Sequence, residues 1–187
     1  ILYAYMASMK RFFIMFLLTL LMSAVLPAQS IRPVPQEMHM EGNRTLNLSK
    51  GVMLSDPKDV FSDASSLLTL KSKGISFAVD FGTSVAQQAG VKAVSGAYRL
   101  EVTPKGILLI GYDEKGVKYG LQTFRQILSL SVDKRVPCCT INDWPDTESR
   151  GLVDSYYGGT WSQEFRLSMI ELAARLKMSS YVYAPKN

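Results

Sequence analysis

Apolar and polar residues alternate in several short stretches of the chain, and this spacing predicts strands. The alternation is clearest at 75–81 and 98–103, and a shorter example covers 45–48. Successive side chains of a strand point to opposite faces, so alternation indicates one buried and one exposed face. An apolar stretch at 107–110 follows Pro104-Lys105-Gly106, which is typical of a turn, and we therefore expect it to form a hairpin with the strand before it.

Two other stretches have apolar residues at helical spacing. The first covers 57–73, where Asp56-Pro57 supplies an N-cap and a first-turn proline, and Gly74 supplies a C-terminal cap. The second covers 113–130 and fits a helix packed on a sheet. Strands with two amphipathic helices, and without β-α-β repetition, predict an α+β domain over 31–140: a mainly antiparallel sheet with two helices packed on it.

The pattern changes after a polar segment, 141–151, which contains Pro145 and ends this domain. Leu152-Val153 predicts a short strand, Ser162 is a good N-cap for a helix over 163–177, and Tyr181 to Ala184 predicts another strand. Strand, helix and strand in this order form one β-α-β unit with parallel strands. A single unit cannot bury both faces of its sheet, so we expect the natural chain to continue.

The first 30 residues have the three-part pattern of a secretory signal peptide. Lys10-Arg11 is followed by an apolar run from Phe12 to Val25 and then by small residues in Ala28-Gln29-Ser30. The run is shorter than the roughly 20 residues that a membrane-spanning helix needs. A buried helix or an anchor is the alternative. We expect a signal peptide at 9–30 preceded by upstream residues 1–8, a secreted or periplasmic protein, and no stable membrane span after cleavage.

Composition and charge exclude several classes of site. The formal net charge is +5 without a basic cluster, which argues against a nucleic-acid partner. Cys138 and Cys139 are neighbours, and adjacent Cα atoms lie about 3.8 Å apart, closer than a disulfide normally allows, so two buried thiols are expected. His39 is the single histidine, which excludes the common zinc motifs and a Ser-His triad within this chain. We expect no metal and no cofactor.

Two sequence motifs before residue 141 resemble a known domain. The motifs are Ile31-Arg-Pro-Val-Pro-Gln36 and Ile110-Gly-Tyr-Asp-Glu-Lys-Gly-Val-Lys-Tyr-Gly-Leu-Gln-Thr-Phe-Arg-Gln-Ile-Leu128. They resemble the non-catalytic α+β domain that precedes the barrel in bacterial β-N-acetylhexosaminidases. That family's junction, an Asp-x-Pro step followed by Arg-Gly, is matched by Asp143-Trp-Pro145 and Arg150-Gly151.

After the junction the chain resembles glycoside hydrolase family 84, which includes O-GlcNAcases and hyaluronidase-like enzymes. The family motif Arg-Gly-x-x-Glu-Gly-Phe-Tyr-Gly-x-x-Trp is matched by Arg150-Gly-Leu-Val-Asp-Ser-Tyr-Tyr-Gly-Gly-Thr-Trp161. A second motif, Tyr-x-Tyr-Ala-Pro-Lys-Asp-Asp, is matched by Tyr181-Val-Tyr-Ala-Pro-Lys-Asn187. The resemblance implies that 141–187 is the start of a catalytic TIM barrel, truncated after its first β-α-β unit, with ligand groups at the C-terminal ends of the strands.

The resemblance also implies a substrate-binding site. Lys186 matches the lysine that hydrogen-bonds hydroxyls of the bound sugar, the alternative being a solvated lysine. Tyr157 and Gly158 match the loop that lines the pocket, although Tyr157 is equally suited to core packing. The family's Glu-Gly pair is Asp154-Ser155 here, so Ser155 takes the place of a glycine whose backbone contacts the sugar, and the penultimate Asp is Asn187.

The activity implied by the family is substrate-assisted, retaining hydrolysis of terminal β-N-acetylglucosamine, the partner being an N-acetylglucosamine-containing glycan. The two aspartates that assist would lie beyond residue 187, so no catalytic residue and no activity are expected in this chain alone. Asp143, Asp146 and Glu148 are interpreted as turn and cap residues. The alternative is a non-catalytic carbohydrate-binding or scaffold protein with a degenerate barrel, and the downstream Asp-Asp pair would discriminate the two.

Overall fold

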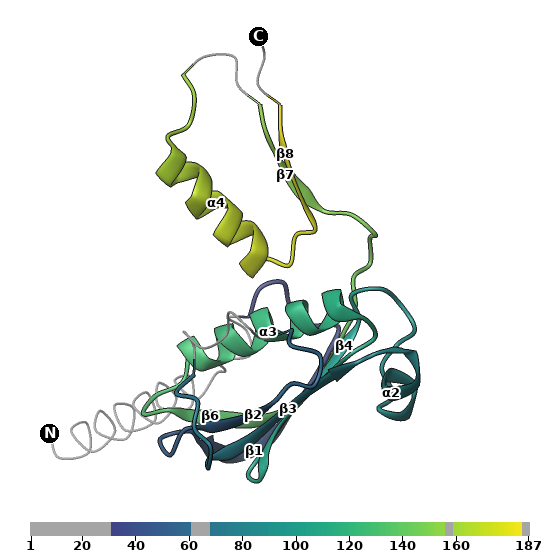
Figure 1. The fold of residues 1–187 in the computed structure, drawn as a ribbon, viewed down its shortest axis with the longest axis vertical. Helices are drawn as coiled ribbons and strands as arrows, with labels where there is room; N and C mark the ends of the chain where they lie inside the picture. Colours follow the sequence, from purple (N-terminus) through teal and green to yellow (C-terminus); the bar gives the residue numbers. More distant parts are fainter. Residues whose placement is uncertain (1–30, 61–67, 156–158, 185–187) are drawn as a thin grey trace, which may run out of the picture. The chain divides into compact units, whose positions relative to one another are not determined.

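A computed structural model describes residues 31–60, 68–155 and 159–184 of the chain (Figure 1). Most strands belong to a six-stranded sheet in the order β1-β6-β4-β5-β3-β2. The neighbours β1-β6, β6-β4 and β4-β5 are antiparallel, whereas β5-β3 and β3-β2 are parallel, so the sheet is mixed. Its strands are β1 Glu37–Asn47, β2 Val52–Ser55, β3 Ile75–Phe81, β4 Tyr98–Thr103, β5 Gly106–Gly111 and β6 Arg135–Asp143.

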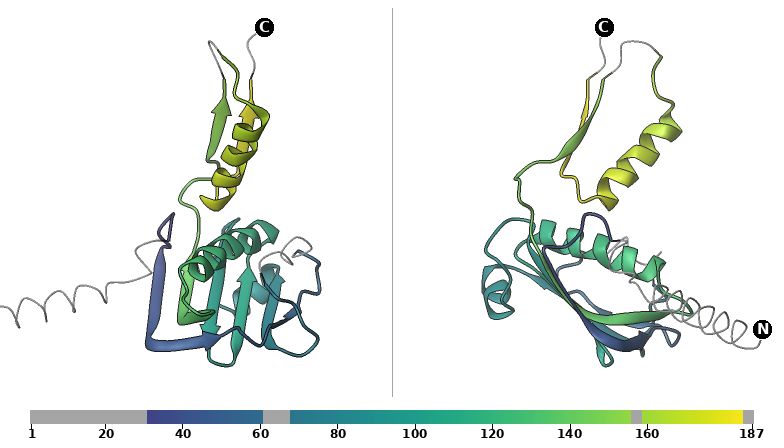
Figure 2. Two further views of the ribbon diagram at one scale, coloured as in Figure 1. Left: turned by 90° about the vertical axis from the view of Figure 1, so that its left-hand side faces the viewer. Right: turned by 180° about the vertical axis from the view of Figure 1, so that it is seen from behind.

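The expected hairpin and the expected second helix are both present. Thr103 pairs with Gly106 across the turn between β4 and β5. The helix α3 covers Glu114–Ser129, and its N-cap Asp113 accepts a hydrogen bond from the backbone N–H of Gly116 at 2.8 Å. The helix lies across one face of the sheet (Figures 1 and 2). A short helix, α2 (Thr83–Gln88), follows β3 and was not predicted.

The prediction of a helix over 57–73 is wrong for the residues that the structure describes. Residues 57–60 form turns, and Leu70 makes a parallel bridge with Val52. Val52 N donates to Thr69 O at 2.9 Å, and Lys71 N donates to Val52 O at 2.9 Å. The edge strand β2 offers unpaired backbone groups, and the chain at 69–71 satisfies them at the expense of helix geometry. Residues 61–67 of the predicted helix lie outside the described part.

The core lies between α3 and the sheet. Phe124 of α3 packs edge-on against Phe77 of β3, with ring centroids 5.2 Å apart, and both side chains are almost fully buried. The close approach of the helix requires glycine at Gly116, because a Cβ there would collide with the backbone oxygen of Ala97. The hydrophobic face that predicted this helix is therefore the face that contacts the sheet.

Cys138 and Cys139 lie within β6 as two free, fully buried thiols, which confirms the prediction. Burial raises the pKa of the Cys139 thiol to about 12, and burial also raises the pKa of Cys138. Only the thiolate is a good nucleophile. We therefore expect DTNB to leave both thiols of the folded chain unlabelled at about pH 8 and to label both after unfolding in guanidinium. Rapid labelling of either thiol in the native chain would contradict this burial.

The chain after the junction forms the predicted β-α-β unit. β7 (Gly151–Asp154) and β8 (Ser180–Tyr183) are parallel, and α4 (Gln163–Arg175) connects them. Ser162 caps α4 by accepting a hydrogen bond from Phe165 N at 3.2 Å. Within α4 only Ala173 is buried, so the apolar face of this helix is largely exposed in the described structure.

Among the described helices, none is both long and apolar enough to cross a bilayer. The predicted signal peptide lies outside the described residues.

Candidate functional site

Four side chains meet where β7 and β8 end, and we call them the strand-end cluster: Asp154, Arg166, Tyr181 and Tyr183. Asp154 is the last residue of β7 and is 1% exposed. Its Oδ2 accepts hydrogen bonds from Arg166 Nε at 2.6 Å and from the Tyr181 hydroxyl at 2.7 Å. The Arg166 guanidinium also lies over the Tyr183 ring, 4.7 Å from its centroid. The cluster therefore ties the first helical turns of α4 to the ends of both strands.

The charges of the strand-end cluster are fixed by these bonds. The hydrogen bond from Arg166, followed by that from Tyr181, lowers the pKa of Asp154. The bond to Asp154 raises the pKa of Arg166, while burial and then Asp154 raise the pKa of Tyr181. At neutral pH Asp154 is therefore a carboxylate, Arg166 a guanidinium and Tyr181 a neutral phenol. A carboxylate held ionised in this way is suited to orienting its neighbours and poorly suited to donating a proton.

The lowered pKa of Asp154 makes stability depend on pH in a defined direction. A folded-state pKa below the unfolded value of about 3.9 gives stability that is present above about pH 4 and lost as pH falls through the folded pKa. In Asp154→Asn the free energy of unfolding should therefore fall less steeply as the pH is lowered than it does in the wild-type chain. Urea unfolding between about pH 7 and pH 2 measures this dependence. Asp133→Asn, at an exposed turn, is the matched control and should keep the wild-type dependence. If Asp154→Asn kept the wild-type dependence on acid pH, the lowered pKa of Asp154 in the folded chain would be contradicted.

Of the predicted substrate-binding residues, the structure describes Ser155. It directly follows Asp154 at the end of β7 and is exposed, so it lies beside the strand-end cluster. Ala184 N donates to Asp154 O at 3.0 Å, which brings the chain leaving β8 to the same edge. Tyr157, Gly158 and Lys186 lie outside the described residues, and their placement stays a prediction.

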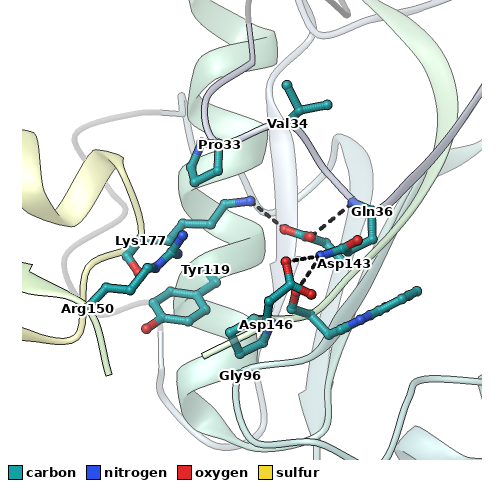
Figure 3. A pocket seen from close by; sticks show the side chains of 11 residues that line it. Pro33, Val34, Gln36, Gly96, Tyr119, Asp143, Asp146, Arg150 and Lys177 are labelled. Atoms are coloured by element: carbon teal, nitrogen blue, oxygen red, sulfur yellow. Dashed lines mark hydrogen bonds and ion pairs between the residues drawn. The ribbon is translucent and has the colours of Figure 1, made fainter. Parts of the chain in front are cut away.

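The interpretation of Asp143 as a turn or cap residue is wrong. It is the last residue of β6, it is 8% exposed, and its Oδ2 lies 2.6 Å from Lys177 Nζ (Figure 3). The same oxygen accepts a hydrogen bond from the Tyr98 hydroxyl at 3.0 Å, while Oδ1 accepts from Gln36 N at 3.1 Å. Asp146 is exposed and accepts from the Gln36 amide at 2.9 Å. Asp143 therefore forms a buried ion pair. The polar residues around it in the sequence had instead indicated an exposed turn.

Lys177 was predicted only as the last residue of a helix. It follows α4 with a φ of 57°, a left-handed conformation that helices usually give to glycine at this position. Its side chain is 2% exposed, and its Nζ donates to the Tyr98 hydroxyl at 3.0 Å as well as to Asp143. Burial lowers the pKa of Lys177, and the Asp143 carboxylate opposes this effect. The one indication of this buried role in the sequence is that a lysine occupies the position after a helix where glycine is usual.

A cavity beside this pair is too small to be the sugar site. It is lined by Gln36, Tyr119, Trp144 and Arg150 together with the ion pair, and its volume is about 70 Å³ (Figure 3). Ligand pockets usually have volumes of about 300–1,000 Å³, whereas one water takes about 30 Å³. This cavity therefore suits water. No group of three or more His, Cys, Asp or Glu residues that could hold a metal ion occurs in the described ranges.

These features define an α+β sheet domain that is joined by a short junction to a β-α-β unit with a polar strand-end cluster. Residues 28–144 match the family described as glycosyl hydrolase family 20, domain 2, and the chain belongs to this family. Residues 150–187 match a second family, described as beta-N-acetylglucosaminidase. The two matches meet at the junction. They confirm the prediction of a β-N-acetylhexosaminidase-type domain before it.

Curated relatives are glycosidases. The chain is 28% identical over 159 residues to the beta-hexosaminidase of Vibrio vulnificus, covering 81% of this chain and 18% of the relative. It is 26% identical over 155 residues to N,N'-diacetylchitobiase of Vibrio harveyi, covering 78% and 17%. The chain thus spans less than a fifth of the length of these relatives. The similarity is therefore to a short part of proteins that are named as a hexosaminidase and a chitobiase.

Solved structures share the fold. CpGH84B superimposes with a TM-score of 0.70 and 27% identity, over 83% of this chain and 29% of that one. A family 20 β-N-acetylglucosaminidase superimposes with a TM-score of 0.67 and 24% identity, over 84% and 30%. The match to the latter shows the fold alone. Both matches extend over the sheet domain and into the unit that follows it.

Proposed function

We propose that this chain supplies the N-terminal part of a secreted or periplasmic glycosidase that removes terminal β-linked N-acetylglucosamine. The observation that carries the proposal is the order of two family matches, a family 20 domain at 28–144 and a β-N-acetylglucosaminidase segment at 150–187, on the two sides of the junction. The strand-end cluster supports it, because barrel enzymes bind their substrates at the C-terminal ends of the strands. The apolar run before residue 31 supports export.

The finer assignment is to family 84 for the segment after the junction. The motif from Arg150 to Trp161 and the likeness to CpGH84B support it. In this reaction the sugar's own acetamido oxygen attacks the anomeric carbon, and configuration is retained, an exception to the usual carboxylate nucleophile. Ser155, Tyr157, Gly158 and Lys186 bind the sugar. Asp154, held ionised by Arg166, fixes the positions of Arg166 and Tyr181 at the end of β7. The acid-base pair comes from later strands of the barrel.

The proposal is tested with para-nitrophenyl N-acetyl-β-D-glucosaminide and two proteins: the 187-residue chain and the full product of the gene. The full product should hydrolyse the substrate and release the β-anomer first, as detected by NMR, while the 187-residue chain should stay at the level of a buffer blank. The matched control substrate is para-nitrophenyl β-D-glucoside. It lacks the acetamido oxygen and should not be cleaved.

Two outcomes would contradict the proposal. A full product that binds N-acetylglucosamine without cleaving the substrate would favour a carbohydrate-binding or scaffold protein. Equal cleavage of the glucoside would rule out assistance by the acetamido group.

A further inference from the structure

Four buried polar side chains connect the sheet domain to the β7-α4-β8 unit. Tyr98 of β4, Thr123 of α3 and Asp143 of β6 belong to the sheet domain, and Lys177 follows α4. Their exposed fractions are 1%, 0%, 8% and 2% in that order. Residues of separate elements thus share one site that excludes solvent, and we call them the junction lock.

Both hydroxyl hydrogens of this network and two of the three ammonium hydrogens of Lys177 have an acceptor. Lys177 Nζ donates to Asp143 Oδ2 at 2.6 Å and to the Tyr98 hydroxyl at 3.0 Å. The Tyr98 hydroxyl donates its single proton to Asp143, and the Thr123 hydroxyl, 2.6 Å away, must then donate to Tyr98. A buried charge is costly unless it is paired, so the ammonium and the carboxylate each require the other in place. Displacement of the unit would leave both charges without an opposite charge.

The backbone around Lys177 is bound by Arg150, which follows the connecting segment. Arg150 Nη2 donates to Lys177 O at 3.0 Å, and the carbonyl of Arg150 accepts from Ser179 N at 2.8 Å. Asp143 and Arg150 are the residues at the two ends of the connecting segment 144–149. Both ends of the segment therefore bind Lys177, one through its side chain and one through its carbonyl.

The conformation of Lys177 separates this role from that of a helix cap. Its φ of 57° is one that glycine adopts without strain and that a residue with a Cβ adopts at a cost. A position that served only to end α4 would gain from glycine. Strain at a residue whose side chain completes a buried network is the pattern expected of a positioning residue.

We propose that Lys177 locks the β7-α4-β8 unit onto the sheet domain, so that the sheet domain determines where the ends of β7 and β8 are held. The coupling is a property of the chain itself and does not depend on the proposed reaction. The lock is released when either Lys177 or Asp143 loses its charge partner.

The test measures cleavage of the connecting segment by a glutamate-specific protease at Glu148, which is exposed. Lys177→Met and Lys177→Gly should each be cut at least tenfold faster than the wild-type chain, while amide hydrogen exchange in β3 and β5 stays unchanged. Asp143→Asn should accelerate cleavage similarly, and the double variant with Lys177→Met should be no faster than either single variant. Lys118→Met, which removes a lysine from the exposed ion pair with Glu114, is the matched control and should be cut at the wild-type rate.

Three results would overturn the proposal. Lys177→Gly cut no faster than the wild type would show that Lys177 only ends the helix. Effects of Lys177→Met and Asp143→Asn that multiply would show that the two residues act independently. The third needs no variant: in the folded wild-type chain, Lys177 should resist acetylation by acetic anhydride while Lys118 is labelled, and equal labelling would show that the lock does not form.

Discussion

Phe124→Ala is expected to lower the free energy of unfolding by about 3–5 kcal/mol, the usual cost of removing a buried phenylalanine. The ring is 1% exposed and packs edge-on against Phe77, so its loss leaves a cavity between α3 and the sheet. Domains of this kind have total stabilities of about 5–15 kcal/mol, so the variant should lose a large part of its stability. Urea unfolding followed by far-UV circular dichroism measures the difference.

Phe165→Ala is the matched control for this substitution. Phe165 lies on α4, is 47% exposed and contacts Trp161 with ring centroids 5.0 Å apart. Its loss removes one aromatic pair and creates no cavity, which should cost less than about 1.5 kcal/mol. Equal costs for the two substitutions would contradict the placement of the core between α3 and the sheet.

Lys186→Ala in the full product of the gene is expected to lower kcat/KM on an N-acetylglucosaminide by about ten- to a hundredfold. A hydrogen bond to a charged group contributes about 1.5–3 kcal/mol, and about 1.4 kcal/mol corresponds to a factor of ten. Steady-state kinetics with para-nitrophenyl N-acetyl-β-D-glucosaminide give the ratio. Unchanged thermal unfolding would show that the effect is on the sugar and not on the fold.

Lys105→Ala is the matched control, because Lys105 lies exposed in the turn between β4 and β5. This variant should keep wild-type kinetics. If Lys186→Ala also kept them, Lys186 would be a solvated lysine and the proposed sugar contact would fall.

The elements that the sequence predicted well are those with local signals. The alternation at 75–81 and 98–103 coincides with β3 and β4, because each strand buries one face against α3. The helix expected over 113–130 is Glu114–Ser129, because Asp113 caps it and its apolar residues Val117, Phe124 and Ile127 are buried. The predicted β-α-β unit is also present, because a local signal, the N-cap Ser162, determines where α4 begins.

The elements that the sequence missed depend on distant partners. β6 has no clean alternation, with Pro137 and two adjacent cysteines at its centre, and it is a strand because β1 and β4 pair with it on both sides. Apolar residues at helical spacing over 57–73 gave no sign that the backbone of Val52 would pair with 69–71. Such pairings are decided by tertiary contacts that override local propensity.

The residues of the candidate sites likewise fall into those with local sequence signals and those that depend on distant partners. The strand-end position of Ser155 followed from a motif and from the β-α-β pattern, both of which are local. The ion pair of Asp143 with Lys177 joins residues 34 positions apart, and a carboxylate in a polar, proline-containing segment resembles a turn residue. Burial of both charges becomes visible only when β6, β4 and α4 are placed together.

The pairing of β1 with β6 also determines when the sheet can be completed during synthesis. Glu37 and Asn142 are joined by a hydrogen bond although 105 positions separate them, and β1 can pair with β6 only after this last strand of the six-stranded sheet has been made. A chain that emerges from its N-terminus first holds β1 as an unpaired strand until Asp143 has appeared, and unpaired strands are prone to aggregate. The waiting strand has the sequence EMHMEGNRTLN, in which charged and polar residues interrupt the apolar ones. Most of these residues contribute little to the core, and charged residues of this kind are the ones that discourage an unpaired strand from pairing with another chain.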